Sequence, residues 1–329
     1  MSELRKDLVS GDWIIIAPER ARRPKFLGAE KKKRIPSPIK ECPFEDLVKS
    51  DNWPPILSFP SDEKWQVAMI KNKYPALVHV KGCAVSIKKG PHFIKSGVGE
   101  HDLVITKDHG KNFADVSLSQ ATEIFKILQK RYKMLAKDQC SVYTSTFFNW
   151  GASAGASLYH PHYQVLTLPI VPPDIGHSLQ GSRRYFQKNK QCVHCVMLQF
   201  DVKDKKRIID INSSAVAVAP FISKVPFEVR VFPKKHLPRF EETSESILRG
   251  VAGLLQSVLK RMRKNLGDPD LNFFIHTAPL KGGAFGYYHW HIEVIPKSSH
   301  WGGFELGTGI DINVVDPEMA ASLLKGKKS

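Results

Sequence analysis

Apolar residues recur at helical spacing in two long segments of the chain, residues 117–135 and 245–266. In each segment they fall at every third or fourth position, which predicts a helix with one buried face. Ser117 stands three residues before Gln120, a pattern typical of a helix N-terminus, and Gly267 is suited to end the second helix. We therefore expect two long amphipathic helices.

Short apolar runs bounded by turn-forming residues predict strands around these helices. The runs are Trp13–Ile16, Val67–Ile70, Val78–Val80, Val142–Phe148, Gln164–Leu168, Phe273–Ile275 and Trp290–Ile295. A loop of small residues, 151–157, joins two of them, and Asp316 followed by Pro317 predicts a short C-terminal helix. The basic, proline-containing segment 20–34 reads as an irregular arm. The pattern as a whole predicts an α+β fold of mostly antiparallel strands.

Histidine and cysteine positions recur in the same order in the two halves of the chain. Each long helix is preceded by one histidine and followed by a His-x-His pair: His109, His160 and His162 in the first half, and His236, His289 and His291 in the second. Cysteine precedes both sets. We predict two tandem units of one design, residues 1–185 and 186–329, each with a mostly antiparallel sheet and one long helix.

Composition limits the class of protein further. The 329 residues carry 49 Lys and Arg against 32 Asp and Glu, a formal net charge of +17, and 42% are hydrophobic, as in globular proteins. No apolar stretch reaches the roughly 18 residues of a membrane span, and no signal peptide is recognisable, so we expect a cytoplasmic protein with no membrane partner. The charge would suit nucleic acid, but a solvated, lysine-rich surface explains it as well.

The five cysteines are too few for a disulfide scaffold, and their odd number favours reduced thiols. Cys192 and Cys195 form a Cys-x-x-Cys pair that needs two further ligands to make a tetrahedral zinc site, and the repeat offers His236 and His289. The alternative, a redox-active pair, lacks its usual βαβ context. We therefore predict one structural zinc site in the second unit.

The first unit repeats this arrangement with one change. Its equivalent residues are Cys42, Glu45, His109 and His160. Glutamate can bind zinc through oxygen, so this set either holds a second metal ion or is held by hydrogen bonds alone. The two remaining cysteines, Cys83 and Cys140, have no partner by spacing, and we expect two buried free thiols.

Alternate residues of a strand share a face, so His160, His162 and Gln164 project together. If His160 is held structurally, His162 is left as a free imidazole beside the small-residue loop. A neutral imidazole is a good nucleophile near pH 7. The loop N–H groups, Ser157 and the Gln164 amide could bind phosphate oxygens. The pattern predicts nucleotidyl transfer through a phosphoramidate on His162.

The second unit has the same pattern of three residues on one face of a strand, with one residue changed. His289, His291 and Glu293 align there, and a carboxylate at the position of the glutamine would repel a phosphate. We therefore expect one active unit and one structural copy.

These motifs resemble those of the galactose-1-phosphate uridylyltransferase family, a branch of the histidine-triad superfamily built from two fused units. The matching segments are Arg20–Pro24, Cys42–Phe44, Asn72–Leu77, Asp108-His109, Phe148–Gly151, Gly155–Gln164, His289-x-His291 and Phe304–Gly309. The resemblance implies that His162 takes the nucleotidyl group from a UDP-sugar, releases a sugar 1-phosphate, and passes UMP to a second hexose 1-phosphate.

The resemblance also assigns residues to the substrates. It implies that the phosphates are held by Gln164, Ser157, Asn149 and the loop at Gly155, and the nucleoside by Asn72. It implies a homodimer with shared active sites, in which the partner subunit supplies Arg20 and Arg23 to phosphate and Phe304 and Glu305 to the hexose.

Three positions depart from the family pattern. Glu45 stands where the family often has cysteine, and Tyr163 is bulkier than the expected residue, although it should point to the opposite face. Asp311 stands where relatives carry Tyr or Gln near the sugar, which leaves the choice of sugar open. The cysteine pair of the second unit is similar to that of the ADP-glucose phosphorylases of the same family, which use phosphate as acceptor.

The sequence therefore predicts a UDP-glucose:hexose-1-phosphate uridylyltransferase. An ADP-glucose phosphorylase-like enzyme is the alternative, and a basic, zinc-containing nucleic-acid-binding protein is a remote third hypothesis. The two enzyme classes share the nucleophile, so the motifs do not separate them.

Overall fold

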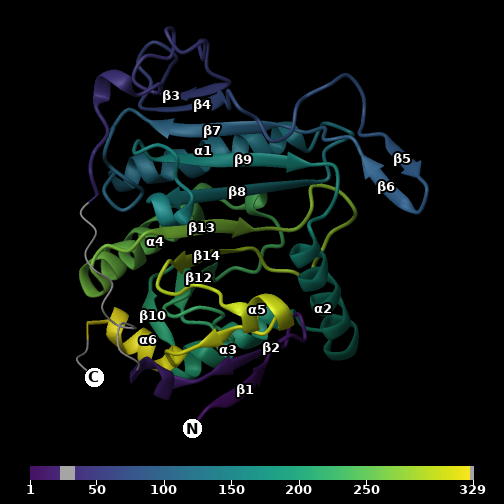
Figure 1. Ribbon diagram of the computed structural model, residues 1–329, viewed down its shortest axis with the longest axis vertical. Coiled ribbons are helices and arrows are strands. Elements are labelled where there is room, and N and C mark those ends of the chain that lie inside the picture. The colour runs from purple at the N-terminus through teal and green to yellow at the C-terminus, as the bar shows by residue number, and fades with distance from the viewer. Residues whose placement is uncertain (23–33, 327–329) are drawn as a thin grey trace.

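One ten-stranded antiparallel sheet forms the centre of the molecule (Figure 1). The computed structural model describes residues 1–22 and 34–326. The strands of the sheet, in spatial order, are β10 (Ile208–Ile211), β11 (Ala215–Val218), β12 (Val229–Pro233), β14 (His291–Pro296), β13 (Leu271–His276), β8 (Tyr143–Trp150), β9 (His162–Leu168), β7 (His101–Thr106), β4 (Val67–Lys71) and β3 (Leu57–Phe59). The predicted α+β class with mostly antiparallel strands is confirmed.

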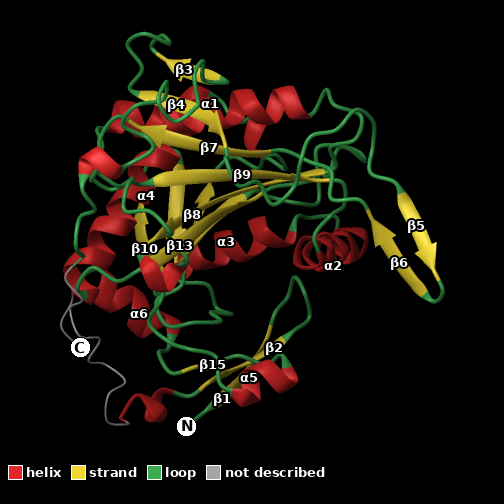
Figure 2. Ribbon diagram, turned by 45° about the horizontal axis from the view of Figure 1, so that its top comes forward, coloured by secondary structure: helices red, strands yellow, loops and turns green. Residues whose placement is uncertain are grey.

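The sheet consists of two five-stranded halves that meet where β8 pairs with β13. Each half contributes one long helix, α1 (Leu118–Leu135) or α4 (Glu245–Leu266). The two helices pack against each other and cover one face of the sheet (Figure 2). The same order of strands and helix therefore occurs twice, as the repeat in the sequence predicted.

Both predicted long helices are confirmed, with the predicted ends. The Ser117 hydroxyl oxygen accepts a hydrogen bond from the Gln120 N–H at 3.1 Å, which satisfies one of the free donors at the start of α1. Gly267 ends α4 in the left-handed conformation, with φ of 79°. The apolar faces of the helices are buried against Phe148, Tyr163 and Phe273 of the sheet, which makes the main core.

Smaller elements lie around the central sheet. A second sheet contains β1 (Glu3–Lys6), β2 (Trp13–Ile16) and β15 (Ile312–Asn313), and a separate hairpin contains β5 (Ser86–Lys89) and β6 (His92–Lys95). The remaining α-helices are α2 (Pro173–Asn189), α3 (Val193–Asp204), α5 (Gly303–Thr308) and α6 (Pro317–Leu324). Short 3₁₀ helices are η1 (Pro18–Arg22), η2 (Ile39–Glu41), η3 (Ala152–Ala154) and η4 (Phe240–Glu242). Among the described residues, no helix combines the length and apolar character needed to cross a bilayer.

Two local predictions differ from the structure. Residues 78–80 do not form a strand, because only Val78 pairs, in an isolated bridge with Val98. Helix α2 was not predicted, since its few buried positions form no continuous apolar stripe. The proposed unit boundary at residue 185 falls inside this helix, and the division into 1–185 and 186–329 stays a prediction.

The prediction that Cys83 and Cys140 are buried free thiols is wrong. The two residues form a disulfide that joins the exposed loop before β5 to the segment after α1. They are 57 residues apart in sequence, and their Cα atoms are 4.8 Å apart. A pairing over this separation depends on the tertiary fold, so spacing along the chain gave no signal for it.

Replacement of both Cys83 and Cys140 by serine is expected to lower the free energy of unfolding by about 2–4 kcal/mol, because the disulfide restricts the unfolded chain. Urea denaturation without reductant measures this change. As a control, reductant should destabilise the wild type to a similar extent and leave the double variant unchanged. Titration of five free thiols in unreduced, denatured wild-type protein would contradict the pairing.

Candidate active site and metal clusters

The candidate nucleophile lies at the start of β9, on the sheet face that α1 and α4 do not cover. Strand pleating points Tyr163 and Val165 into the core beneath the helices, as predicted for Tyr163. His162 and Gln164 therefore project from the opposite face. The structure thus brings the two motif residues to one surface.

Backbone hydrogen bonding fixes the orientation of the His162 ring. Its Nδ1 lies 3.0 Å from the carbonyl oxygen of His160, so Nδ1 carries the proton and Nε2 keeps its lone pair. The ring is buried and meets Phe44 edge-on, with centroids 5.7 Å apart. Burial lowers the pKa of His162 below its ordinary value, which keeps the imidazole neutral at pH 7. These features suit a nucleophile.

The small-residue loop beside His162 is anchored by residues of the second half of the chain. Asp270 accepts hydrogen bonds from the backbone N–H of Ser153 at 2.9 Å and from its hydroxyl at 2.6 Å. Gly151 begins the loop with φ of 87°, and an added Cβ would collide with the Asp270 carboxylate. The loop conformation therefore depends on glycine at 151 and on the acid facing it.

Two asparagines hold the other side of the same loop. Asn272 on β13 donates to the Asn149 Oδ1 and to the Ala154 carbonyl, both at 2.8 Å. The Asn149 amide in turn donates to the Gly155 carbonyl at 3.4 Å. Asn149 and Asn272 face each other in the β8–β13 register. Ser157 lies exposed in this loop, where the structure gives it no fixed role.

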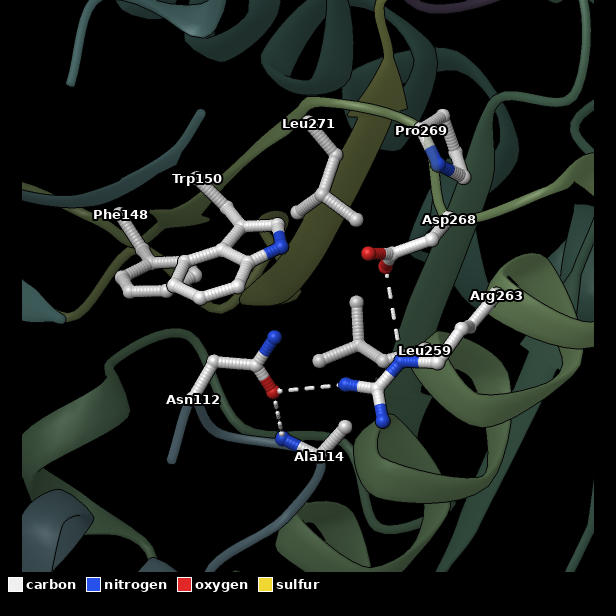
Figure 3. A pocket seen from close by; sticks show the side chains of 9 residues that line it. All are labelled: Asn112, Ala114, Phe148, Trp150, Leu259, Arg263, Asp268, Pro269 and Leu271. Atoms are coloured by element: carbon white, nitrogen blue, oxygen red, sulfur yellow. Dashed lines mark hydrogen bonds and ion pairs between the residues drawn. The ribbon is translucent and has the colours of Figure 1, made fainter. Parts of the chain in front are cut away.

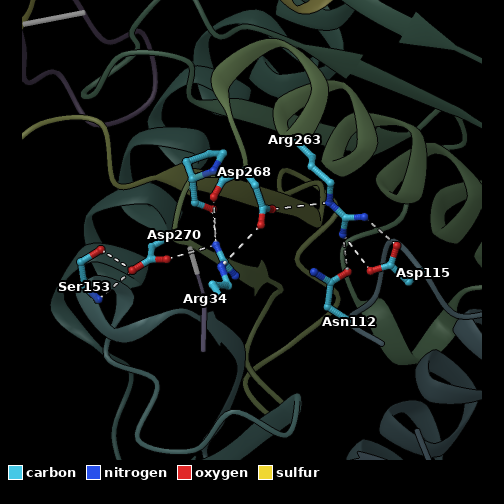
Figure 4. Close-up of polar contacts among 8 residues, drawn as sticks. Arg34, Asn112, Asp115, Ser153, Arg263, Asp268 and Asp270 are labelled. Carbon is cyan, nitrogen blue, oxygen red and sulfur yellow. Dashed lines mark hydrogen bonds and ion pairs between the residues drawn. The ribbon is translucent and has the colours of Figure 1, made fainter. Parts of the chain in front are cut away.

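Arg34, at the end of the basic arm, completes the anchor. Figure 4 shows its guanidinium between Asp268 and Asp270, with an ion pair to Asp270 at 3.1 Å. It also lies over the Trp150 ring, 4.3 Å from the centroid. Burial lowers the pKa of Arg34, although the two carboxylates oppose this shift. Arg34 thus joins the acidic residues that hold the loop.

A small cavity beside Trp150 lies on the helix side of the sheet (Figure 3). Its volume is about 10 Å³, and Leu259, Arg263 and Leu271 are among its lining residues. This volume is enough for about one water molecule and far below that of a substrate pocket. The cavity is therefore a packing gap next to the loop anchor.

Gln164 has a partner that the sequence did not indicate. Its Oε1 lies 3.0 Å from Nε2 of His101, the first residue of β7. The Asn72 side-chain nitrogen lies 3.2 Å from the same His101 nitrogen. The predicted nucleoside residue and the predicted phosphate residue therefore meet through a third side chain.

The predicted first metal cluster is brought together. Cys42, Glu45, His109 and His160 place their ligand atoms within 4.8 Å of one another. The Nε2 atoms of His160 and His109 bond to the carbonyl oxygens of Thr106 and Ser37, at 2.8 and 3.0 Å. Both Nδ1 atoms are therefore left to face the cluster, which is the arrangement expected for metal-bound histidine.

The second cluster also forms. Cys192, Cys195 and His236 could hold a metal ion, and His289 Nδ1 lies 3.5 Å from Cys195 Sγ. Hydrogen bonds from Cys195 and His236 lower the pKa of Cys192 to about 5. This favours a thiolate, the form in which cysteine binds zinc. Three of the four predicted residues thus form the cluster, and His289 adjoins it through Cys195.

The second unit repeats the histidine geometry but not its surroundings. His291 Nδ1 lies 3.1 Å from the His289 carbonyl oxygen, as in the first unit. Its ring is stacked between Phe232 and His276, with centroids 4.6 and 4.8 Å away. A cavity of about 710 Å³ lies over this face. The second unit therefore keeps the orientation of the histidine ring, but it packs His291 against more aromatic rings than His162 has.

Glu293, which replaces the glutamine in this copy, belongs to a buried ionic group. Arg230 lies between Glu293 and Glu228, at 3.2 and 2.9 Å. Burial opposes ionisation of Glu293, but Arg230 and His276 hold its pKa at about 2. Burial, together with the charge of Glu293, raises the pKa of Glu228 to about 7. The carboxylate at this position is therefore ionised and paired.

Two of the residues expected from a partner subunit lie away from β9 within one chain. Phe304 and Glu305 belong to α5, which lies beside β2 at the far end of the molecule from β9 (Figure 1). Arg20 is exposed in η1, and Asp311 directly precedes β15. Arg23 lies outside the described residues. A shared site in a homodimer stays a prediction.

The chain is similar in sequence and in fold to known proteins. Residues 86–325 match a family described as "Domain of unknown function (DUF4921)". ADP-glucose phosphorylase of Arabidopsis thaliana is 35% identical, over 98% of this chain and 92% of that protein. Galactose-1-phosphate uridylyltransferase of Thermotoga maritima is 25% identical, over 99% and 98%. A crystal structure of the Arabidopsis phosphorylase with bound ADP-glucose superposes with a TM-score of 0.85 at 33% identity, covering 100% of both chains.

Replacement of Asp270 by alanine is expected to loosen the loop 151–157, because both hydrogen bonds to Ser153 are lost. Bonds to a charged acceptor stabilise by about 1.5–3 kcal/mol, so amide hydrogen exchange in this loop should accelerate roughly tenfold or more. Asp268→Asn is the matched control, since Asp268 contacts Arg34 and Arg263 but not the loop. Equal exchange rates in the two variants would contradict the anchor.

Proposed function

This chain belongs to the galactose-1-phosphate uridylyltransferase family, and we propose that it transfers a nucleoside monophosphate from a nucleotide sugar to a phosphate-bearing acceptor. The transfer passes through a covalent nucleotidyl group on His162. The observation that carries the proposal is the hydrogen bond of His162 Nδ1 to the His160 carbonyl, which leaves a neutral Nε2 beside the anchored loop. The substrates would be a nucleotide sugar and either phosphate or a hexose 1-phosphate.

In the first half-reaction, His162 Nε2 attacks the α-phosphorus of the nucleotide sugar. A P–N bond forms, and the bond from this phosphorus to the oxygen of the departing sugar 1-phosphate breaks. The positive charge that develops on the imidazole is stabilised by the His160 carbonyl, which accepts from Nδ1–H. The leaving group is a phosphate of low basicity, so it needs no proton from an acid.

In the second half-reaction, an oxygen of the acceptor phosphate attacks the same phosphorus. The P–N bond breaks, and its electron pair returns to His162 Nε2. The loop N–H groups, Ser157 and the Gln164 amide would hold the non-bridging oxygens in both steps. Because donor and acceptor react at one phosphorus in turn, a single nucleophile serves both steps.

ADP-glucose and inorganic phosphate form the substrate pair that we place first. Two observations support it: the higher identity to an ADP-glucose phosphorylase over nearly the whole chain, and the intact cysteine pair of the second cluster. This reverses the order of the two activities predicted from the sequence. UDP-glucose with galactose 1-phosphate is the second pair, supported by the uridylyltransferase relatives.

Zinc is the metal that the two clusters fit best. Thiolate and imidazole ligands suit Zn²⁺, and Cys192, Cys195, His236 and His289 would hold one ion in a closed, structural site. Cys42, Glu45, His109 and His160 would hold a second. Zinc would supply structural order here and no reacting atom. The His160 ring is bonded to the Thr106 carbonyl, and the backbone carbonyl of the same residue orients His162.

The test of the proposed function is a covalent adduct on His162. Mixing the protein with ADP-glucose alone should yield one nucleoside monophosphate per chain, detected by intact mass and peptide mapping, with release of glucose 1-phosphate. His162→Gly should abolish the adduct and lower turnover by at least about 10⁴-fold, because the nucleophile is absent.

The second unit provides the matched control. His291→Gln alters the equivalent histidine and should leave the adduct in place. Addition of phosphate or galactose 1-phosphate to the adduct then identifies the acceptor. If neither ADP-glucose nor UDP-glucose labels wild-type protein, the proposed function is wrong.

Metal content provides a further test. Protein purified without chelators is expected to hold one zinc at the Cys192 cluster, and Cys192→Ser should lose it and unfold at lower temperature, because the ion is part of the fold. Glu45→Ala tests the first cluster separately. Zinc-free wild-type protein of undiminished stability would contradict the assignment.

A further inference from the structure

A histidine outside the His-x-His-x-Gln motif contacts the amide proposed to bind phosphate. His101 is the first residue of β7 and faces Leu166 of β9 in the strand register. Gln164 lies two residues from Leu166 and therefore on the same face. His101 Nε2 reaches Gln164 Oε1 at 3.0 Å. We infer that His101 is a positioning residue, which fixes the Gln164 amide so that its NH₂ group faces the transferred phosphate.

The tautomer of His101 follows from its second ring nitrogen. The backbone N–H of Ala76 donates to His101 Nδ1 at 3.1 Å, so Nδ1 is an acceptor and carries no proton. The proton of the neutral ring is then on Nε2. The hydrogen bond to Gln164 therefore runs from His101 Nε2–H to Oε1, as the placement of the amide oxygen requires.

The direction of this bond decides what Gln164 offers to a ligand. A glutamine amide has one acceptor end and one donor end, and rotation by 180° exchanges them. With Oε1 held by His101, the NH₂ end is the one left for substrate. The reverse orientation would point a carbonyl oxygen at phosphate oxygens, and two acceptors repel each other. A freely rotating amide would present the wrong end for part of the time.

The start of β7, where His101 lies, also holds Asn72 in place. The backbone N–H of Asn72 donates to the His101 carbonyl at 2.9 Å, and the Asn72 Oδ1 accepts from the Tyr74 N–H at 2.9 Å. Because His101 Nε2 is protonated, it does not accept a hydrogen bond from the Asn72 NH₂ group, whose nitrogen lies 3.2 Å away. The His101 ring thus orients the Gln164 amide, while the His101 backbone and Tyr74 hold Asn72 beside it.

The second unit supports this inference, because it differs from the first at both of the positions that interact. Leu103 faces Gln164 in the first unit, and Arg230 faces Glu293 in the second, so the position of His101 corresponds to Glu228. Where the glutamine is replaced by a carboxylate, the histidine is replaced as well. The buried Glu228 bonds instead to Arg230, at 2.9 Å. The histidine that donates to Oε1 is therefore present in the unit that has the glutamine. In the unit that has the glutamate, the equivalent position holds Glu228.

A double-mutant cycle on the full chain tests this inference, which rests on the proposed function. The variants are His101→Phe, Gln164→Ala and the pair together, and the readouts are kcat, KM and the single-turnover rate of His162 labelling by ADP-glucose. His101→Phe is expected to lower kcat roughly 30- to 100-fold with little change in KM, because an oriented donor acts mainly in the transition state. In the Gln164→Ala background the same change should cost less than about threefold.

Two further measurements separate positioning from a loss of structure. His101→Gln keeps an N–H donor near the place of Nε2 and should recover most of the lost rate. In wild-type protein, ¹⁵N NMR of the histidine rings should show His101 protonated on Nε2 only. Equal penalties in the two backgrounds, or an Nδ1-protonated His101, would overturn the inference while leaving the proposed function intact. Wild-type protein that neither nucleotide sugar labels would overturn both.

Discussion

The hydrogen bond from His162 Nδ1 to the His160 carbonyl is the interaction on which the candidate site depends. It fixes the tautomer without a carboxylate, so the imidazole gains no extra basicity and stays neutral in its buried place. The acceptor is itself immobilised, since the His160 ring is tied to Thr106 and to the first cluster. His160 thus links the first cluster to the ring of His162 through its own side chain and backbone.

The repeated half has the same histidine geometry in different surroundings. His291 has the same backbone acceptor and the same tautomer. What differs is the charge beside it, because Glu293, Glu228 and Arg230 form a closed ionic group where the first half has an amide and an imidazole. The charges of this group are paired with each other, so Arg230 is not left to bind an incoming phosphate. The two halves therefore differ in the neighbours of the histidine and not in the orientation of its ring.

Periodic and repeated features were predictable from the sequence, and contacts between distant strands were not. The helices, their caps and the shared face of His162 and Gln164 follow from local pattern, and the metal clusters follow from the repeat. His101, Asp270 and the Cys83–Cys140 disulfide depend on which strands and loops are neighbours in space. Each of these residues is unremarkable within its own segment. Their roles appear only once the order of the ten strands is known.

The support that Asp270 and Asn272 give to the loop of the other half has a consequence for the autonomy of the two halves. A polypeptide ending after α2 would contain the nucleophile and its motif, yet it would lack both anchors. It would also leave the full length of β8 as an unpaired sheet edge, open to association with other chains. Each half therefore depends on the other, one for the support of its loop and both for a paired sheet edge.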